Sequence, residues 1–113
     1  MKEMLHGAIL EGFGEARLAI RSQDYARAYH WLERTHILTQ RRPLLHAQSH
    51  VFMLYVGIRT RDPREVVGQI PRVFAALLFS TIWVPSGNTG RARVSAFQVM
   101  PISQELRNLL SEE

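Results

Sequence analysis

The sequence contains no cysteine, which excludes disulfide bonds, thiolate metal sites and cysteine nucleophiles. Lysine is scarce as well, since Lys2 is the single lysine among 14 basic residues. No apolar run is long enough to cross a bilayer, and the N-terminal residues, with Glu3 and Glu11, do not resemble a signal peptide. We therefore expect a cytoplasmic protein with no membrane segment.

The positive charge is dispersed along the chain. The net charge is +4, and the arginines are scattered from Arg17 to Arg107 without a dense run. Scattered charge is typical of a solvated face, so nucleic acid is not the expected partner. A chain of 113 residues with 46% hydrophobic content predicts one globular domain that spans residues 1–113.

Apolar residues recur at spacings of three and four, which predicts an all-α fold. The expected helices cover residues 3–21, 25–41, 43–58 and 63–84, with a kink or break near Pro71. They pair as antiparallel hairpins over 3–41 and 43–84. A turn-rich, extended segment follows at 85–113, and Ser103 would cap a short terminal helix within it. The run VFAALLFSTIWV, Val73 to Val84, predicts a buried helix.

An internal repeat supports the pairing of helices into hairpins. LAIRSQDYARA, Leu18 to Ala28, aligns with VGIRTRDPREV, Val56 to Val66, so both hairpins are expected to use the same turn. The second helix also resembles loosely a tetratricopeptide helix, because Tyr25, Ala28, Leu32 and Thr35 have its small-and-bulky spacing. This resemblance implies an alternative without chemistry, an interaction module that binds a protein partner or forms a homo-oligomer.

Polar side chains gather on helix faces that otherwise carry apolar residues. At 3.6 residues per turn, three expected helices each present such a group on one side. The groups are Glu33, His36 and Gln40; His46 and His50; and Glu65, Gln69 and Arg72. The first two helices meet at a tight break, so their histidines are expected to approach one another.

Imidazole and carboxylate groups at these spacings suit a divalent zinc, nickel, iron or manganese ion. We predict a mononuclear site of His36, His46 and His50, completed by Glu33 or Glu65. The remaining polar groups, Gln40, Gln69 and Arg72, would orient the ligands or an anion. The competing interpretation is a hydrogen-bonded polar core in which Glu65 only completes a capping box with Asp62. His6 and His30 are expected at the surface, and the sequence names no reaction.

The segment VPSGNTGRAR forms a second candidate feature. Gly87, Asn88 and Gly90 tolerate positive φ, and with Thr89 they could form a nest of backbone N–H groups that binds an anion. The plainer interpretation is a turn that reverses the chain after the fourth helix. If functional, this loop is expected to close over the helical site.

The segments THILTQ, HAQSH, VVGQIPR and PSGNTGRARVSAFQVMP occur in this order along the chain. They resemble the landmarks of a family of small bacterial proteins classed as a domain of unknown function. The resemblance covers most of the chain from the second helix onward. It implies an α-helical bacterial protein and no particular activity.

Overall fold

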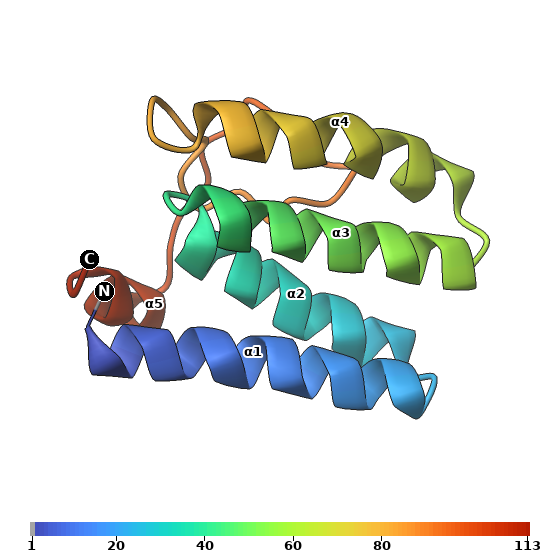
Figure 1. Cartoon of the computed structure of the whole chain (residues 1–113), viewed down its shortest axis with the longest axis horizontal. Coiled ribbons are helices and arrows are strands. Elements are labelled where there is room, and N and C mark those ends of the chain that lie inside the picture. The colour runs from blue at the N-terminus through green and yellow to red at the C-terminus, as the bar shows by residue number, and fades with distance from the viewer. Residues whose placement is uncertain (1) are drawn as a thin grey trace.

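The computed structural model describes residues 2–113, which form five helices and no strand (Figure 1). The helices are α1 (Glu3–Arg21), α2 (Tyr25–Thr39), α3 (Pro43–Arg59), α4 (Pro63–Phe79) and α5 (Gln104–Leu110). The all-α prediction is confirmed. No described helix combines the length and the apolar character that crossing a membrane would require.

The first four helices form two antiparallel hairpins that lie side by side (Figure 1). Helices α1 and α2 pack as one hairpin, α3 and α4 pack as the other, and α2 contacts α3 between them. Helix α5 lies beside the start of α1, where the backbone N–H of Leu5 donates to a carboxylate oxygen of Glu112 at 3.1 Å. This contact ties the end of the chain back to its beginning.

The two hairpin turns have the same backbone geometry, as the internal repeat predicts. Gln23 and Arg61 occupy equivalent positions, and both have a positive φ, of 61° and 55°. The aspartate that follows each of them caps the next helix, because Asp24 accepts from the N–H of Arg27 and Asp62 accepts from that of Glu65. Each turn therefore directs the second helix back along the first in the same way.

The hydrophobic core lies between α1, α2 and α3. Its largest fully buried side chains come from these three helices, and α5 closes one end with Leu106. The large, fully buried core side chains of α1, α2 and α3 are Leu5, Ile9, Leu32, Leu38, Met53 and Val56. Burying one leucine or isoleucine side chain stabilises the fold by about 1.5–3 kcal/mol. Because this core occupies one side of α2 and α3, their other side is free to face α4 and the segment after it.

Helix α4 differs from the expectation in three respects. It continues through Pro71 without a break, and it ends at Phe79 instead of 84, just as α2 ends at Thr39 instead of 41. The run from Val73 to Val84 is also not buried, because Phe74 is 62% and Ile82 76% exposed. Helix α4 packs on α3 with one face, and no described element covers its outer face. The prediction of a buried helix was therefore wrong.

The segment between α4 and α5 is irregular. Residues 85–103 form successive turns, for example where Val94 N–H donates to the carbonyl of Arg91 and Gln98 N–H to that of Ser95. In Figure 1 this orange segment runs back along the helices and then returns to α5. Ser103 caps α5 by accepting from the N–H of Leu106, as predicted. The segment thus passes close to the polar side of α2, α3 and α4.

Candidate functional site

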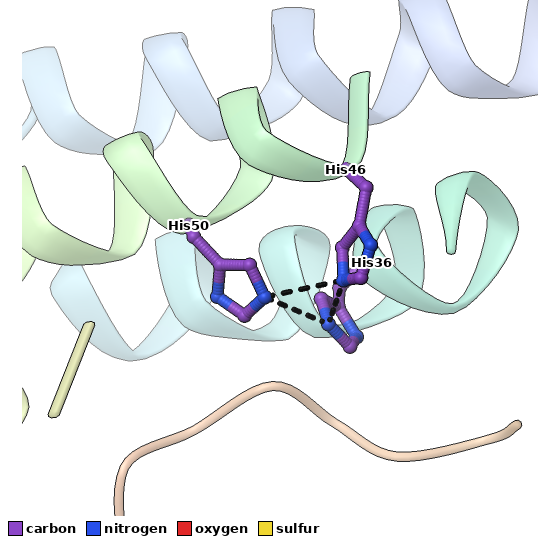
Figure 2. A group of neighbouring side chains, drawn as sticks. All are labelled: His36, His46 and His50. Carbon is purple, nitrogen blue, oxygen red and sulfur yellow. Dashed lines mark hydrogen bonds between the residues drawn. The ribbon is translucent and has the colours of Figure 1, made fainter. Parts of the chain in front are cut away.

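Three histidines from two helices converge in the interior. His36 comes from α2, and His46 and His50 lie one turn apart on α3 (Figure 2). Their exposed fractions are only 2%, 6% and 3%. The Nε2 atom of His36 lies 3.0 Å from that of His46 and 3.2 Å from that of His50, and the last pair is also 3.2 Å apart. The convergence that the helix spacing predicted is therefore present.

The opposite nitrogen of each ring, Nδ1, has its own hydrogen-bond partner. These partners come from three different segments, namely α4, its C-terminal end and the loop that follows. The contacts join His36 to the carbonyl oxygen of Asn88 (2.8 Å), His46 to Oγ of Ser80 (2.8 Å) and His50 to Oε1 of Gln69 (2.7 Å). Each ring is thus held at its outer edge.

All three partners act as acceptors, which fixes the tautomer of each ring. The carbonyl oxygen of Asn88 can only accept. The Ser80 hydroxyl donates its hydrogen to the carbonyl of Ala76, so its oxygen accepts from the ring. The amide nitrogen of Gln69 donates to Glu65 at 2.9 Å, which turns its oxygen toward the histidine. Each Nδ1 therefore carries the hydrogen, and each Nε2 presents a lone pair to the other two.

Burial keeps the three imidazoles neutral. Desolvation lowers the pKa of His46 from 6.5 to about 4. Desolvation and, after it, the neighbouring His46 together lower the pKa of His50 from 6.5 to about 3. The pKa of His36 is also lowered well below 6.5, first by burial and then by the other two rings. At neutral pH the cluster is therefore three uncharged rings, the form in which histidine binds metal ions.

The two glutamates do not join the histidine cluster. Among the described residues, the convergent ligand atoms belong to His36, His46 and His50 alone. Glu33 instead pairs with Arg91 at 3.1 Å, and the fully buried Glu65 accepts from Nε of Arg91 at 2.7 Å. The structure thus corrects the expectation that one of these carboxylates lies beside the three rings.

Glu65 instead acts on the cluster through Gln69. One carboxylate oxygen accepts from the Gln69 amide, and the other accepts from Arg91 and from the N–H of Ala92 at 3.1 Å. The simple capping-box interpretation does not hold either, because the N–H of Asp62 donates to the carbonyl of Gly57 and not to Glu65. Glu65 therefore fixes the orientation of the amide that holds His50.

The loop at residues 87–90 covers the histidines. Gly90 lies so close to His36 that a Cβ on it would meet ring atoms at 2.7–2.9 Å. Of the backbone N–H groups expected to bind an anion, that of Gly87 donates to Gln40 Oε1 at 3.0 Å and that of Gly90 to Asn88 Oδ1 at 2.9 Å. The loop thus serves as a lid on the ring cluster, and Gln40 holds that lid.

Two residues of the site, Ser80 and Asn88, were missed or assigned another role by sequence reasoning. Ser80 is 4% exposed and interrupts an apolar run, which is the one signal that could have identified it. Asn88 contributes its backbone carbonyl, and no side-chain pattern predicts such a contact. Its amide also holds the loop by donating to the carbonyls of Ser95 (2.8 Å) and Gln98 (2.9 Å).

A cavity of about 520 Å³ adjoins the cluster. The three histidines form part of its wall, and most of the rest is apolar, including Phe79, Trp83 and Phe97. Arg72 also lines it, with guanidinium N–H groups that donate to the carbonyls of Gly68 (2.8 Å) and Val94 (2.9 Å). The arrangement is a set of three neutral nitrogen donors beside a cavity that admits a small molecule.

Comparison with known protein families matches residues 3–110 to one described as "Protein of unknown function (DUF3703)". Searches of curated proteins and of solved structures returned no match. The family match covers all five helices and the three histidines. Any functional conclusion for this chain must therefore come from the geometry of the site.

Proposed function

The chain belongs to the DUF3703 family, and we propose that it binds one divalent transition-metal ion through Nε2 of His36, His46 and His50. The observation that supports this proposal is the orientation of three lone pairs toward one another at 3.0–3.2 Å. Tetrahedral zinc with bonds of 2.0–2.1 Å separates its ligand nitrogens by about 3.3–3.4 Å. The observed separations are slightly shorter, so a small outward movement of the rings would admit the ion.

A purely hydrogen-bonded core explains the same contacts less well. A neutral imidazole carries one ring hydrogen, and each of these rings already uses it at Nδ1. If one ring carried its hydrogen on Nε2 instead, it could donate to only one of the other two Nε2 atoms. It would then lose the hydrogen bond that its Nδ1 donates. A cation at the centre satisfies all three lone pairs and leaves the outer hydrogen bonds in place.

The ligand set narrows the choice of metal. Three imidazoles favour zinc, nickel, copper or iron(II) over magnesium or calcium, which prefer oxygen ligands. Three histidines with a free fourth position form a ligand set known from catalytic zinc sites. Zinc is therefore the first ion to test.

The test measures bound metal in the full chain purified without a histidine tag. We expect one ion per chain after zinc loading and removal of excess metal, and less than a tenth of that in His36→Ala and His50→Ala. The matched control is His30→Ala, because His30 is exposed and should leave the stoichiometry unchanged. Absence of bound zinc in the parent, or full occupancy in both site variants, would reject the proposal.

We also propose that the outward face of α4 pairs with a second copy of this chain. Val67, Ile70, Phe74 and Leu78 recur at helical spacing on this face and are 69%, 46%, 62% and 66% exposed. Arg72 is the single charged residue between Val66 and Val84. An uncharged apolar face of this kind is a typical interaction surface, and two identical faces match under a two-fold axis.

The pairing is tested by measuring the mass of the particle in solution. Light scattering should give a dimer for the parent and a monomer for Phe74→Glu. Leu10→Glu is the matched control, because Leu10 is similarly exposed (59%) but lies on α1. A parent that is monomeric at a concentration of about 100 μM would reject this second proposal, because a dimer that dissociates there has a binding free energy weaker than about 6 kcal/mol.

A further inference from the structure

The cavity beside the histidines has the size of a small-molecule site. Its volume of about 520 Å³ falls within the range of about 300–1,000 Å³ that is typical of ligand pockets. Its walls are mainly hydrocarbon, with large side chains from the end of α4 and from the segment after it. No acidic side chain lines it in the described part of the chain. A molecule that fills it must therefore be largely apolar.

Arg72 gives this cavity an uncompensated positive charge. Its guanidinium is half-buried and donates to two backbone carbonyls, and within residues 2–113 it forms no salt bridge. The nearby carboxylate of Glu65 is already engaged by Arg91 and Gln69. A partly buried cation without an ionic partner is costly unless an anion joins it.

The metal centre would add to the same charge. Three neutral imidazoles do not reduce the charge of a divalent ion, so the ion and Arg72 together present three positive charges to one apolar cavity. A ligand that suits it has one anionic end and a hydrocarbon body. A phosphate is less suitable, because its three acceptor oxygens need several hydrogen-bond donors, whereas the walls beyond Arg72 are mainly hydrocarbon.

We propose that the cavity binds a small apolar carboxylic acid, aliphatic or aromatic. Its carboxylate would occupy the free coordination position of the metal ion, beside the guanidinium of Arg72, and its hydrocarbon body would contact Trp83 and Phe97. This inference rests on the proposed metal site. In it, Arg72 selects ligands with a negative charge, and Trp83 and Phe97 select ligands with a hydrocarbon chain or ring.

The test uses the full chain loaded with Co²⁺, whose visible absorption reports its ligands. Acetate, hexanoate and inorganic phosphate are titrated as probes. Hexanoate should change the cobalt spectrum and bind at least about tenfold tighter than acetate, because its additional CH₂ groups leave water. Trp83→Ala should remove most of this preference and leave acetate binding unchanged.

Two variants of α4 separate the role of Arg72 from a general loss of charge. Arg72→Gln should weaken hexanoate binding by about tenfold or more with cobalt affinity retained, whereas Arg72→Lys should keep part of it. Arg64→Gln is the matched control, because Arg64 is an exposed arginine on the same helix. Unchanged cobalt spectra before ligand addition show that each variant keeps the histidine site.

The outcomes distinguish this inference from the metal proposal. A chain that binds cobalt through its histidines but gives no response to hexanoate, or binds phosphate or acetate as tightly, overturns the carboxylate inference and leaves the metal site standing. Equal hexanoate binding in the Arg72→Gln variant and the parent overturns it as well. Failure to bind any metal rejects both proposals.

Discussion

The side-chain oxygen of Gln69 lies 2.7 Å from Nδ1 of His50, and its amide nitrogen lies 2.9 Å from a carboxylate oxygen of Glu65. The amide therefore connects the ring of His50 to the fully buried carboxylate of Glu65 through two hydrogen bonds, while the carboxylate itself stays away from the other histidines. A hydrogen-bond acceptor at Nδ1 makes the opposite ring nitrogen a better donor to a metal ion.

We predict that Gln69→Leu lowers zinc affinity without removing a ligand. Loss of the acceptor frees the ring of His50 to rotate and to place its hydrogen on Nε2, so the affinity should fall by about 10–100-fold. Competition with a coloured chelator measures the change. Gln104→Leu is the control, because Gln104 is exposed on α5. Unchanged affinity in Gln69→Leu would contradict a role for this amide.

The loop position of Gly90 gives a second prediction. A Cβ there would overlap the ring of His36, and the residue has a φ of 86°, which L-residues rarely adopt. Gly90→Ala should therefore destabilise the fold by about 1–3 kcal/mol and displace His36 from the cluster. Urea unfolding and bound zinc measure the two effects.

Gly7→Ala is the matched control for this substitution. No atom lies within 4 Å of a Cβ built on Gly7, and the residue is inside α1. Alanine has the higher helix propensity, so this variant should gain about 0.5–1 kcal/mol. A Gly90→Ala variant as stable as the parent and fully loaded with zinc would show that the loop does not need to approach His36.

A third prediction concerns pH and follows from the lowered pKa values. The folded histidines have pKa values below the unfolded value of 6.5, so the unfolded chain binds more protons as the pH falls. The contribution of these groups to the free energy of unfolding is therefore fully present above pH 6.5. For His46 it is lost as the pH falls from there toward about 4, its folded pKa. In the chain without metal, three such groups lower the free energy of unfolding by up to about 4 kcal/mol for each unit by which the pH falls.

Urea unfolding of the metal-free chain between pH 7 and pH 5 measures this slope. His50→Leu removes one of the three buried groups and should reduce the slope by roughly one third. His30→Ala removes an exposed histidine and should leave it nearly unchanged. A parent whose stability is constant over this range would show that the rings are not buried in their neutral form.

Local chemistry explains which parts of the fold were predictable. Asp24 and Asp62 are helix caps recognisable from sequence, so the starts of α2 and α4 were placed correctly. Burial of α4 was not predictable, because an apolar run does not specify what packs against it. Phe74 and Ile82 satisfy the pattern of a core helix and yet lie in solvent.

The same distinction applies to the site. The convergence of His36, His46 and His50 follows from helix spacing and a short connection, both of which are local in sequence. The position of Glu65 depends on Arg91, which belongs to a segment without periodicity. Its contacts are long-range, so helix geometry alone could place Glu65 on the correct face but could not direct its carboxylate.

The last prediction concerns Arg91, which compensates the charge of Glu65. Its Nε lies 2.7 Å from the carboxylate, its Nη1 bonds to Glu33, and its guanidinium carbon lies 3.4 Å from the ring centre of Tyr29. Arg91→Gln leaves a fully buried carboxylate without its cation, which should cost about 3–5 kcal/mol in urea unfolding. Zinc affinity should fall as well, because Glu65 also holds the amide of Gln69.

Arg93→Gln is the control for Arg91→Gln, because Arg93 pairs with Asp62 at the surface and its loss should change stability little. The double variant Glu65→Gln/Arg91→Gln removes both charges and should be more stable than Arg91→Gln alone, since no buried charge is left unpaired. Equal losses in Arg91→Gln and Arg93→Gln would contradict the argument. So would additive losses in the double variant, because they would mean that the two charges do not depend on each other.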